Sequence, residues 1–449
     1  MVSRLLRKFR SWISGEGGDA DSEDMTHSRH AVLLFLISGV SVILVFLSNY
    51  VLIKLAGPGN YGSYIFVFNL VYLLAAFGSL GLDTLFLKKT VLYHDENKRA
   101  EWRGLWRFGV VTVILGALVL TAFSRRLVSF SDTIPFDEGV QWYAFMFVSL
   151  CTLALTQLAQ SILQARGRFV WSQAGEKIMR PFLLVLLTTG YWLLRGKPDA
   201  DNLLWINWTG ILLTLLLLLF VTSRVMPFYR EKVTPRFETK YWMLLALSFF
   251  AVDFLYHFNA RIHLFLLGVF NPSVDMGIFN ISLRVSELTG LMLTVVNIVI
   301  APQVTQRFAR GDLRALQALI TRTARLALVA GTLVVLAIVL FRQPILRFFD
   351  DTYLAGETSL LICCIGQFVN VFFGSVGILL VMTGHQKYSI VSLVAGMVLG
   401  VVLNLWLTPR FGINGTAVAT SAGLICWNLA MYYFVRRHLR IRTTGLGIL

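Results

Sequence analysis

Apolar residues run through this chain in long blocks rather than in the alternation of a β-strand. Each block is roughly 20 residues long, which is the length of α-helix that crosses roughly 30 Å of hydrocarbon. The predicted spans are 31–55, 61–87, 105–123, 139–163, 170–194, 203–223, 241–268, 275–300, 319–341, 357–382, 389–407 and 415–435. The pattern predicts an all-α polytopic membrane protein with about twelve transmembrane helices.

Charge fixes the predicted orientation of these spans. The 449 residues are 56% hydrophobic and only 14% charged, which excludes an ordinary soluble domain. The net charge is +16, and most of the 40 Lys and Arg residues lie in alternate short segments rather than in one basic region. This is the distribution of cytoplasmic loops, so we expect both termini in the cytoplasm and no nucleic-acid partner.

The segments between spans divide the chain into two halves. Residues 31–223 form an N-terminal lobe of spans one to six, and residues 241–435 form a C-terminal lobe of spans seven to twelve. Residues 224–240 are the cytoplasmic linker, and residues 436–449 are a basic cytoplasmic tail. Residues 1–30 form a cytoplasmic N-terminal tail. Two interpretations of this tail stay open: an amphipathic helix at the membrane interface, or an irregular basic segment.

Several function classes find no support in the sequence. The predicted outer loops are too short for the extracytoplasmic chemistry of glycan polymerases and ligases, and no Gly-rich phosphate loop indicates a pump driven by nucleotide hydrolysis. The four cysteines lie inside apolar spans and have no metal-ligand spacing. We therefore expect neither an enzyme nor a metal site.

Three segments resemble the Wzx-type polysaccharide and O-antigen flippases, an oligosaccharide flippase family of the MATE/MOP exporter superfamily. The segments are Gly57-Pro-Gly-Asn-Tyr-Gly-Ser-Tyr64 with Phe77-Gly-Ser-Leu-Gly-Leu82, then Met276-Gly-Ile-Phe279 with Leu283-Arg284 and Ala301-Pro302, and finally Leu403-Asn404, Pro409 and Gly412-Ile-Asn-Gly-Thr-Ala-Val-Ala-Thr420. The sequence departs from the family pattern at Asp83 and Thr84, where many relatives carry small or apolar residues.

The resemblance implies a fold and an activity. The fold is a MATE-like bundle of two six-helix lobes around a cavity. The activity is the transfer, by alternating access, of a polyprenyl-diphosphate-linked oligosaccharide across the inner membrane of a bacterium during biosynthesis of lipopolysaccharide or another surface polysaccharide. Its partners are then membrane lipids, glycosyltransferases, a polymerase and a chain-length regulator. A MATE-like ion-coupled exporter of small cationic drugs and a scaffold for glycosyltransferases remain alternatives.

Ionisable residues at membrane depth are costly and mark candidate sites. Arg is suited to phosphate because its planar guanidinium binds two oxygens at once. We therefore assign the anionic substrate to Arg261, Arg284 and Lys54. Asp253, His257, Glu287 and Asp83 are assigned to a polar cavity or to ion coupling.

A plainer interpretation of the same residues stays open. Asp253, His257 and Arg261 share one helical face at spacing four, and Arg284 and Glu287 are three apart, so ion pairs within each helix would neutralise these charges. Lys54 and Asp83 lie near span ends, where their side chains reach the interface. We expect no cofactor, and a proton or sodium gradient is the expected source of energy.

Overall fold

The computed structural model describes residues 22–128, 140–226 and 233–445, and this part of the chain is helical with no strand. The α-helices are α2 (Ser22–Ala56), α3 (Pro58–Gly78), α4 (Leu82–Asp95), α5 (Arg99–Val128), α6 (Val140–Ala165), α7 (Phe169–Ala174), α8 (Arg180–Arg195), α9 (Ala200–Val225), α10 (Thr239–Phe270), α11 (Ser273–Glu287), α12 (Leu291–Ala309), α13 (Leu313–Phe349), α14 (Glu357–Phe373), α15 (Val376–Met382) and α16 (Gln386–Leu439). A π-helix, Gly175–Met179, joins α7 to α8, and short 3-10 helices precede α12 and α14. The amphipathic helix considered for the N-terminal tail lies outside the described residues.

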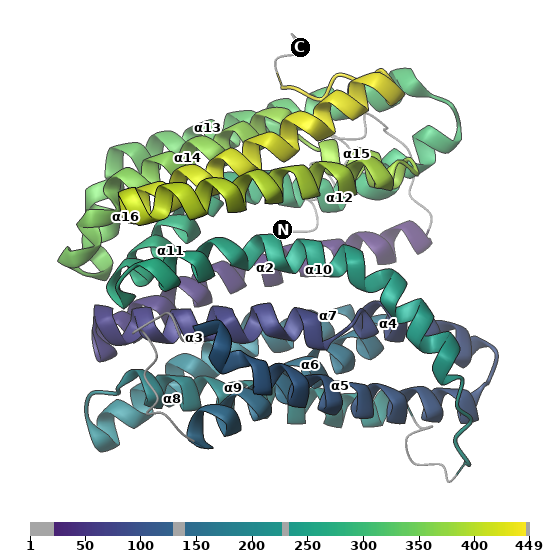
Figure 1. Ribbon diagram of the computed structural model, residues 1–449. Helices are drawn as coiled ribbons and strands as arrows, with labels where there is room; N and C mark the ends of the chain where they lie inside the picture. The colour runs from purple at the N-terminus through teal and green to yellow at the C-terminus, as the bar shows by residue number, and fades with distance from the viewer. Residues whose placement is uncertain (1–21, 129–139, 227–232, 446–449) are drawn as a thin grey trace. The chain divides into compact units, whose positions relative to one another are not determined.

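The helices gather into two compact units. The N-terminal unit is Leu36–Gly277, and the C-terminal unit is Met1–Phe35 with Ile278–Leu449. Within the N-terminal unit, α10 packs along α3 and against α4 (Figure 1). Helix α10, which we counted as the first span of the C-terminal lobe, thus packs with the helices that precede the linker 224–240.

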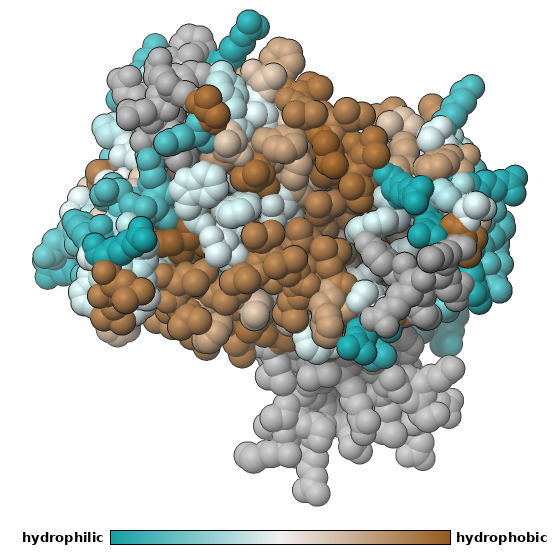
Figure 2. Space-filling model, turned by 90° about the horizontal axis from the view of Figure 1, so that it is seen from below, coloured by the Kyte–Doolittle hydropathy of each residue, from teal (hydrophilic) through white to brown (hydrophobic). Residues whose placement is uncertain are grey.

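The surface of these helices is that of a membrane protein. In the part of the chain that the structure describes, ten helical segments are long and apolar enough to cross a membrane. Large apolar side chains remain exposed along α5 and α9, among them Leu115, Leu118, Leu216 and Phe220. Figure 2 shows one face on which apolar side chains form a broad area between hydrophilic zones. Exposure on this scale suits lipid rather than water, and the predicted all-α polytopic class is confirmed.

Helix α16 contains two of the predicted spans, 389–407 and 415–435. Its backbone reverses at Gly412, where φ is 54° and ψ is −132°. A Cβ atom on Gly396 would lie 2.6 Å from the carbonyl oxygen of Gly423, so the two halves of α16 pack back to back. Small residues permit this close approach, as in other membrane helices. The predicted span 61–87 is instead two helices, because Leu80 and Gly81 take positive φ between α3 and α4. The total of twelve spans and the cytoplasmic termini stay predictions.

Candidate functional site

A row of aromatic side chains on α3 forms one wall of the candidate site. Tyr64, Phe68 and Tyr72 stand four residues apart, so they project from one face of the helix. The ring centroids of Tyr64 and Phe68 are 5.6 Å apart, and those of Phe68 and Tyr72 are 4.6 Å apart. The row is therefore a continuous aromatic surface inside the N-terminal unit.

Arg180 reaches this aromatic row from the start of α8. One Nη atom donates a hydrogen bond to the hydroxyl of Tyr72, and the other donates to Oδ1 of Asn207 on α9 over 3.3 Å. The guanidinium carbon lies 4.6 Å from the ring centroid of Phe68 and 5.3 Å from that of Tyr72. Contacts of this kind contribute roughly 0.5–2 kcal/mol each, depending on how dry the site is. Helix packing and aromatic contacts thus hold the guanidinium in place.

Arg261 approaches the same aromatic side chains from α10. Its Nη1 atom donates a hydrogen bond of 2.9 Å to Oδ1 of Asn69 on α3. Its guanidinium carbon lies 4.9 Å from the ring centroid of Tyr72 and 5.9 Å from that of Phe68. Two arginines from different helices therefore share Tyr72 and Phe68.

The electrostatics of this arginine pair favour an anion. The hydrogen-bond acceptors named above are neutral side chains, so these bonds orient the two guanidinium groups without adding negative charge. The Nε atom of Arg180 is buried and has no hydrogen-bond partner in the structure. A buried donor without an acceptor costs roughly 1–3 kcal/mol. An anionic ligand would supply both the missing acceptor and the balancing charge.

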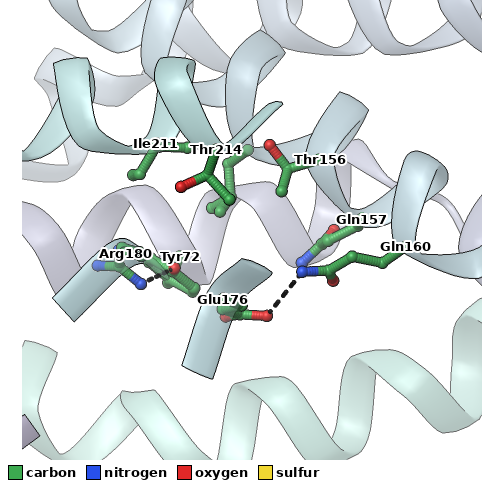
Figure 3. A pocket seen from close by; sticks show the side chains of 9 residues that line it. Tyr72, Thr156, Gln157, Gln160, Glu176, Arg180, Ile211 and Thr214 are labelled. Carbon is green, nitrogen blue, oxygen red and sulfur yellow. Dashed lines mark hydrogen bonds between the residues drawn. The ribbon is translucent and has the colours of Figure 1, made fainter. Parts of the chain in front are cut away.

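A pocket opens beside Arg180. It is lined by Tyr72, Leu153, Thr156, Gln157, Gln160, Glu176, Arg180, Ile211 and Thr214, which come from α3, α6, α8, α9 and the π-helix. In Figure 3, Arg180 and Tyr72 point toward each other, while Glu176 points toward Gln160. The Nε2 atom of Gln160 donates a hydrogen bond of 3.4 Å to the Glu176 carboxylate. Amide, hydroxyl and carboxylate groups therefore lie next to the cationic part of the site.

Four other predicted site residues, Lys54, Asp83, Asp253 and His257, take no part in the contacts of Arg180 and Arg261 described above. Lys54 is exposed, with its Nζ atom 5.9 Å from the ring centroid of Tyr50. Asp83 is half-buried in the first turn of α4, and its Oδ1 atom is buried without a hydrogen-bond partner. His257 is exposed, and the side chain of Asp253 lies outside the described residues. Of the substrate-binding residues that we predicted, Arg261 is the one found in this site.

Arg284 and Glu287 lie in the C-terminal unit, at the end of α11. They form an ion pair of 3.0 Å, with 35% and 42% of their side-chain surfaces exposed. The pairing within the helix that we left open is therefore present. Its partial exposure leaves both side chains accessible. Within the described residues, no group of three or more His, Cys, Asp and Glu is placed to hold a metal ion.

The sequence interpretation did not single out Arg180, although this residue lies within the predicted span 170–194. In the structure, Phe169–Arg195 is one candidate span, and Arg180 lies within it. A single Arg followed by Pro181 inside an apolar run was the available signal. The spacing of Tyr64, Phe68 and Tyr72 was a second signal, since a row of aromatic ring faces attracts a cation.

Comparisons with known proteins agree with this architecture. Residues 245–406, less than half of the chain, match the family described as MatE. The chain is 22% identical over 312 residues to the probable low-salt glycan biosynthesis flippase Agl15 of Haloferax volcanii. That match covers 69% of this chain and 64% of the archaeal protein, so just under two thirds of the relative is spanned.

Solved structures extend the likeness to nearly the whole chain. The lipid II flippase MurJ in an inward closed conformation gives a TM-score of 0.70 at 14% identity, covering 90% of this chain and 87% of that one. An inward-facing multidrug resistance MATE transporter of the MOP superfamily gives 0.67 at 13% identity, with 89% and 94% covered. A MOP superfamily transporter from Pyrococcus furiosus, whose binding pocket is described as having reverse polarity, gives 0.58 at 12% identity, with 91% and 95% covered. The chain has the multi-span, all-helical fold of the MATE/MOP superfamily of transporters and flippases.

Proposed function

We propose that this protein is a flippase that moves a polyprenyl-diphosphate-linked oligosaccharide across the cytoplasmic membrane of a bacterium by alternating access. The observation that carries the proposal is the pair of guanidinium groups, from Arg180 and Arg261, over the Tyr72 and Phe68 rings. The substrate is an anion at its diphosphate and a polar glycan beyond it. The proposed activity makes and breaks no covalent bond.

The site has the chemistry that a diphosphate requires. A guanidinium stays charged in a low-dielectric environment and binds two phosphate oxygens in one plane. The aromatic row restricts both side chains, so little further conformational entropy is lost when a ligand binds. Gln157, Gln160 and Thr156 beside Arg180 offer donors and acceptors for the hydroxyls of a neighbouring sugar.

The names of the relatives are compatible with this activity. Agl15 is called a probable flippase of glycan biosynthesis, and MurJ is called the lipid II flippase. Both names describe transfer of a glycan or a lipid-linked substrate. We extend that substrate class to this chain because its site is cationic.

The second candidate function is the export of small cationic drugs with ion coupling. The match to the MatE family and the likeness to MATE structures favour it. The arginine pair argues against it, because a cation would be repelled at the site. Resistance to cationic dyes and antibiotics in an efflux-deficient strain tests this alternative, and wild-type protein that confers resistance would support drug export.

Complementation of a strain that lacks this gene tests the flippase proposal. Arg180→Ala and Arg261→Ala should each abolish the surface glycan while the protein stays at its normal level in the membrane. Arg195→Ala is the matched control, because Arg195 is exposed at the end of α8. Arg180→Lys should restore export only in part, since Lys keeps the charge but loses the planar pair of donors. Normal surface glycan from both alanine variants would refute the anion site.

Net transfer needs a source of energy and a supply of substrate. We propose coupling to a proton or sodium gradient, with Asp253, His257, Glu287 and Asp83 as the candidate groups. Glycosyltransferases would supply the lipid-linked glycan, and a polymerase with its chain-length regulator would consume it. Measuring the rate of substrate flipping in vesicles with and without an imposed ion gradient tests this coupling. Equal rates in both would refute it.

A further inference from the structure

Glu176 and Arg180 have the spacing of an ion pair but do not form one. Residues four apart on an α-helix share a face, and a Glu placed before an Arg at this spacing pairs readily. In the structure, Glu176 accepts a hydrogen bond from Gln160, whereas Arg180 donates to Tyr72 and Asn207. Among the described residues, no ion pair joins Glu176 to Arg180. Their separate hydrogen-bond partners keep the two charges apart.

The π-helix Gly175–Met179 forms the backbone between the two charges. The backbone N–H of Arg180 donates to the carbonyl of Gly175, five residues back, which widens the turn beyond that of an α-helix. Side chains four apart still lie near one face of such a turn, so the backbone leaves Glu176 within reach of Arg180. Pro181 favours the wide turn, because a proline inside an α-helix lacks the N–H donor and collides with the carbonyl four residues earlier. Turns of this kind occur frequently at functional sites.

The two partners differ in how firmly they are held. Glu176 is exposed, and its bond to Gln160 spans 3.4 Å, so the carboxylate can change partners at little cost. Arg180 retains a buried Nε donor with no acceptor. A carboxylate from within the chain and a phosphate from a ligand are therefore rival acceptors for the same guanidinium.

We propose that Glu176 is the internal counter-ion of the anion site and competes with the substrate diphosphate for Arg180. This rests on the proposed function. In the conformation that the structure shows, Glu176 is hydrogen-bonded to Gln160, and Arg180 is left ready for the anion. When the Glu176 side chain leaves Gln160 and turns toward Arg180, its carboxylate displaces the phosphate. Glu176 is then a positioning residue for substrate release.

Binding of farnesyl diphosphate, a short polyprenyl diphosphate, to the purified full-length protein in detergent tests the competition. Glu176→Gln keeps the shape and the Gln160 contact but removes the negative charge. Its affinity for the probe should rise by roughly two- to fivefold, the size expected for a partly exposed ion pair. Glu96→Gln is the matched control, because Glu96 is an exposed carboxylate of the same unit that pairs with Lys98. Unchanged or weaker binding by Glu176→Gln would overturn the proposal.

Export in cells gives the second measurement. A variant that binds the probe more tightly but releases it slowly should export less surface glycan than wild type at an equal protein level. Normal or raised export by Glu176→Gln would contradict a role in release.

The arginine variants separate failure of this inference from failure of the proposed function. Loss of probe binding in Arg180→Ala and Arg261→Ala, combined with wild-type affinity in Glu176→Gln, would reject the counter-ion alone. Wild-type affinity in both alanine variants would reject the anion site itself.

Discussion

The Nη1 atom of Arg261 lies 2.9 Å from Oδ1 of Asn69, on a helix 192 residues away in the sequence. The Asn69 side chain is 1% exposed, and its Nδ2 atom donates to the carbonyl oxygen of Ile65 over 2.8 Å. That second bond fixes which way the amide faces, so its oxygen is directed at the guanidinium. A neutral acceptor on α3 thus orients the guanidinium of Arg261.

Replacing this neutral acceptor with a charged one should inactivate the site. Asn69→Asp would place a carboxylate against Arg261 and neutralise it, so we expect at least a roughly tenfold loss of affinity for farnesyl diphosphate, which corresponds to about 1.4 kcal/mol. Asn69→Ala removes the orienting bond but not the charge, and its loss should be smaller. Titration of the purified variants with the probe measures both. An Asp variant that binds as well as the Ala variant would show that the charge of Arg261 does not contribute.

The hydroxyl of Tyr93 links α4 to the start of α10. It accepts a hydrogen bond of 2.9 Å from Nε1 of Trp242, which is fully buried, and donates to Glu238 over 3.3 Å. Burial raises the pKa of Tyr93 to about 12, so the hydroxyl stays protonated and keeps both roles at physiological pH. Tyr93→Phe would strand the indole N–H, at a cost of roughly 1–3 kcal/mol.

We therefore expect Tyr93→Phe to lower the midpoint of thermal unfolding in detergent by several degrees, with probe binding unchanged. Tyr143→Phe serves as the control, since Tyr143 is 39% exposed on α6. Equal unfolding midpoints for the two variants would mean that the Tyr93 bonds contribute nothing measurable.

The class of this protein could be predicted from its sequence because that signal is local. An apolar run and its flanking charges determine whether a segment crosses the membrane, whatever the rest of the chain does. The helix breaks were harder to place. Residues 61–87 form one apolar run, yet the chain takes positive φ at Leu80 and Gly81.

The site itself depends on contacts between distant segments. Arg180 meets Tyr72 across 108 residues of sequence, and Arg261 meets Asn69 across 192. No spacing rule within one helix reveals such contacts. The ion pair of Arg284 and Glu287 was predictable, because its partners are three residues apart on one helix.

The contact between Gly396 and Gly423 should tolerate no side chain. A Cβ atom on Gly396 would lie 2.6 Å from the Gly423 carbonyl oxygen and 2.9 Å from Cβ of Trp427. Gly396→Ala must push the two halves of α16 apart, and overpacking of this kind typically costs about 1–3 kcal/mol. Gly190→Ala is the control, because no atom lies within 4 Å of the position that its Cβ would take and alanine favours a helix by roughly 1 kcal/mol. Thermal unfolding in detergent should therefore shift downward for Gly396→Ala and not for Gly190→Ala.

Variants of the ion pair of Arg284 and Glu287 can distinguish a structural role of Arg284 from contact between Arg284 and a ligand. Both side chains are more than a third exposed, at 35% and 42%, so the pair should contribute only about 0.2–1 kcal/mol to stability. We expect Arg284→Ala and Glu287→Ala to unfold near the wild-type temperature. If Arg284 contacts the diphosphate, then Arg284→Ala loses export, and the double variant Arg284→Ala with Glu287→Ala does not recover it. Recovery of export in the double variant would instead show that Arg284 serves only to balance Glu287, and a double-mutant cycle on export and unfolding temperature distinguishes the two outcomes.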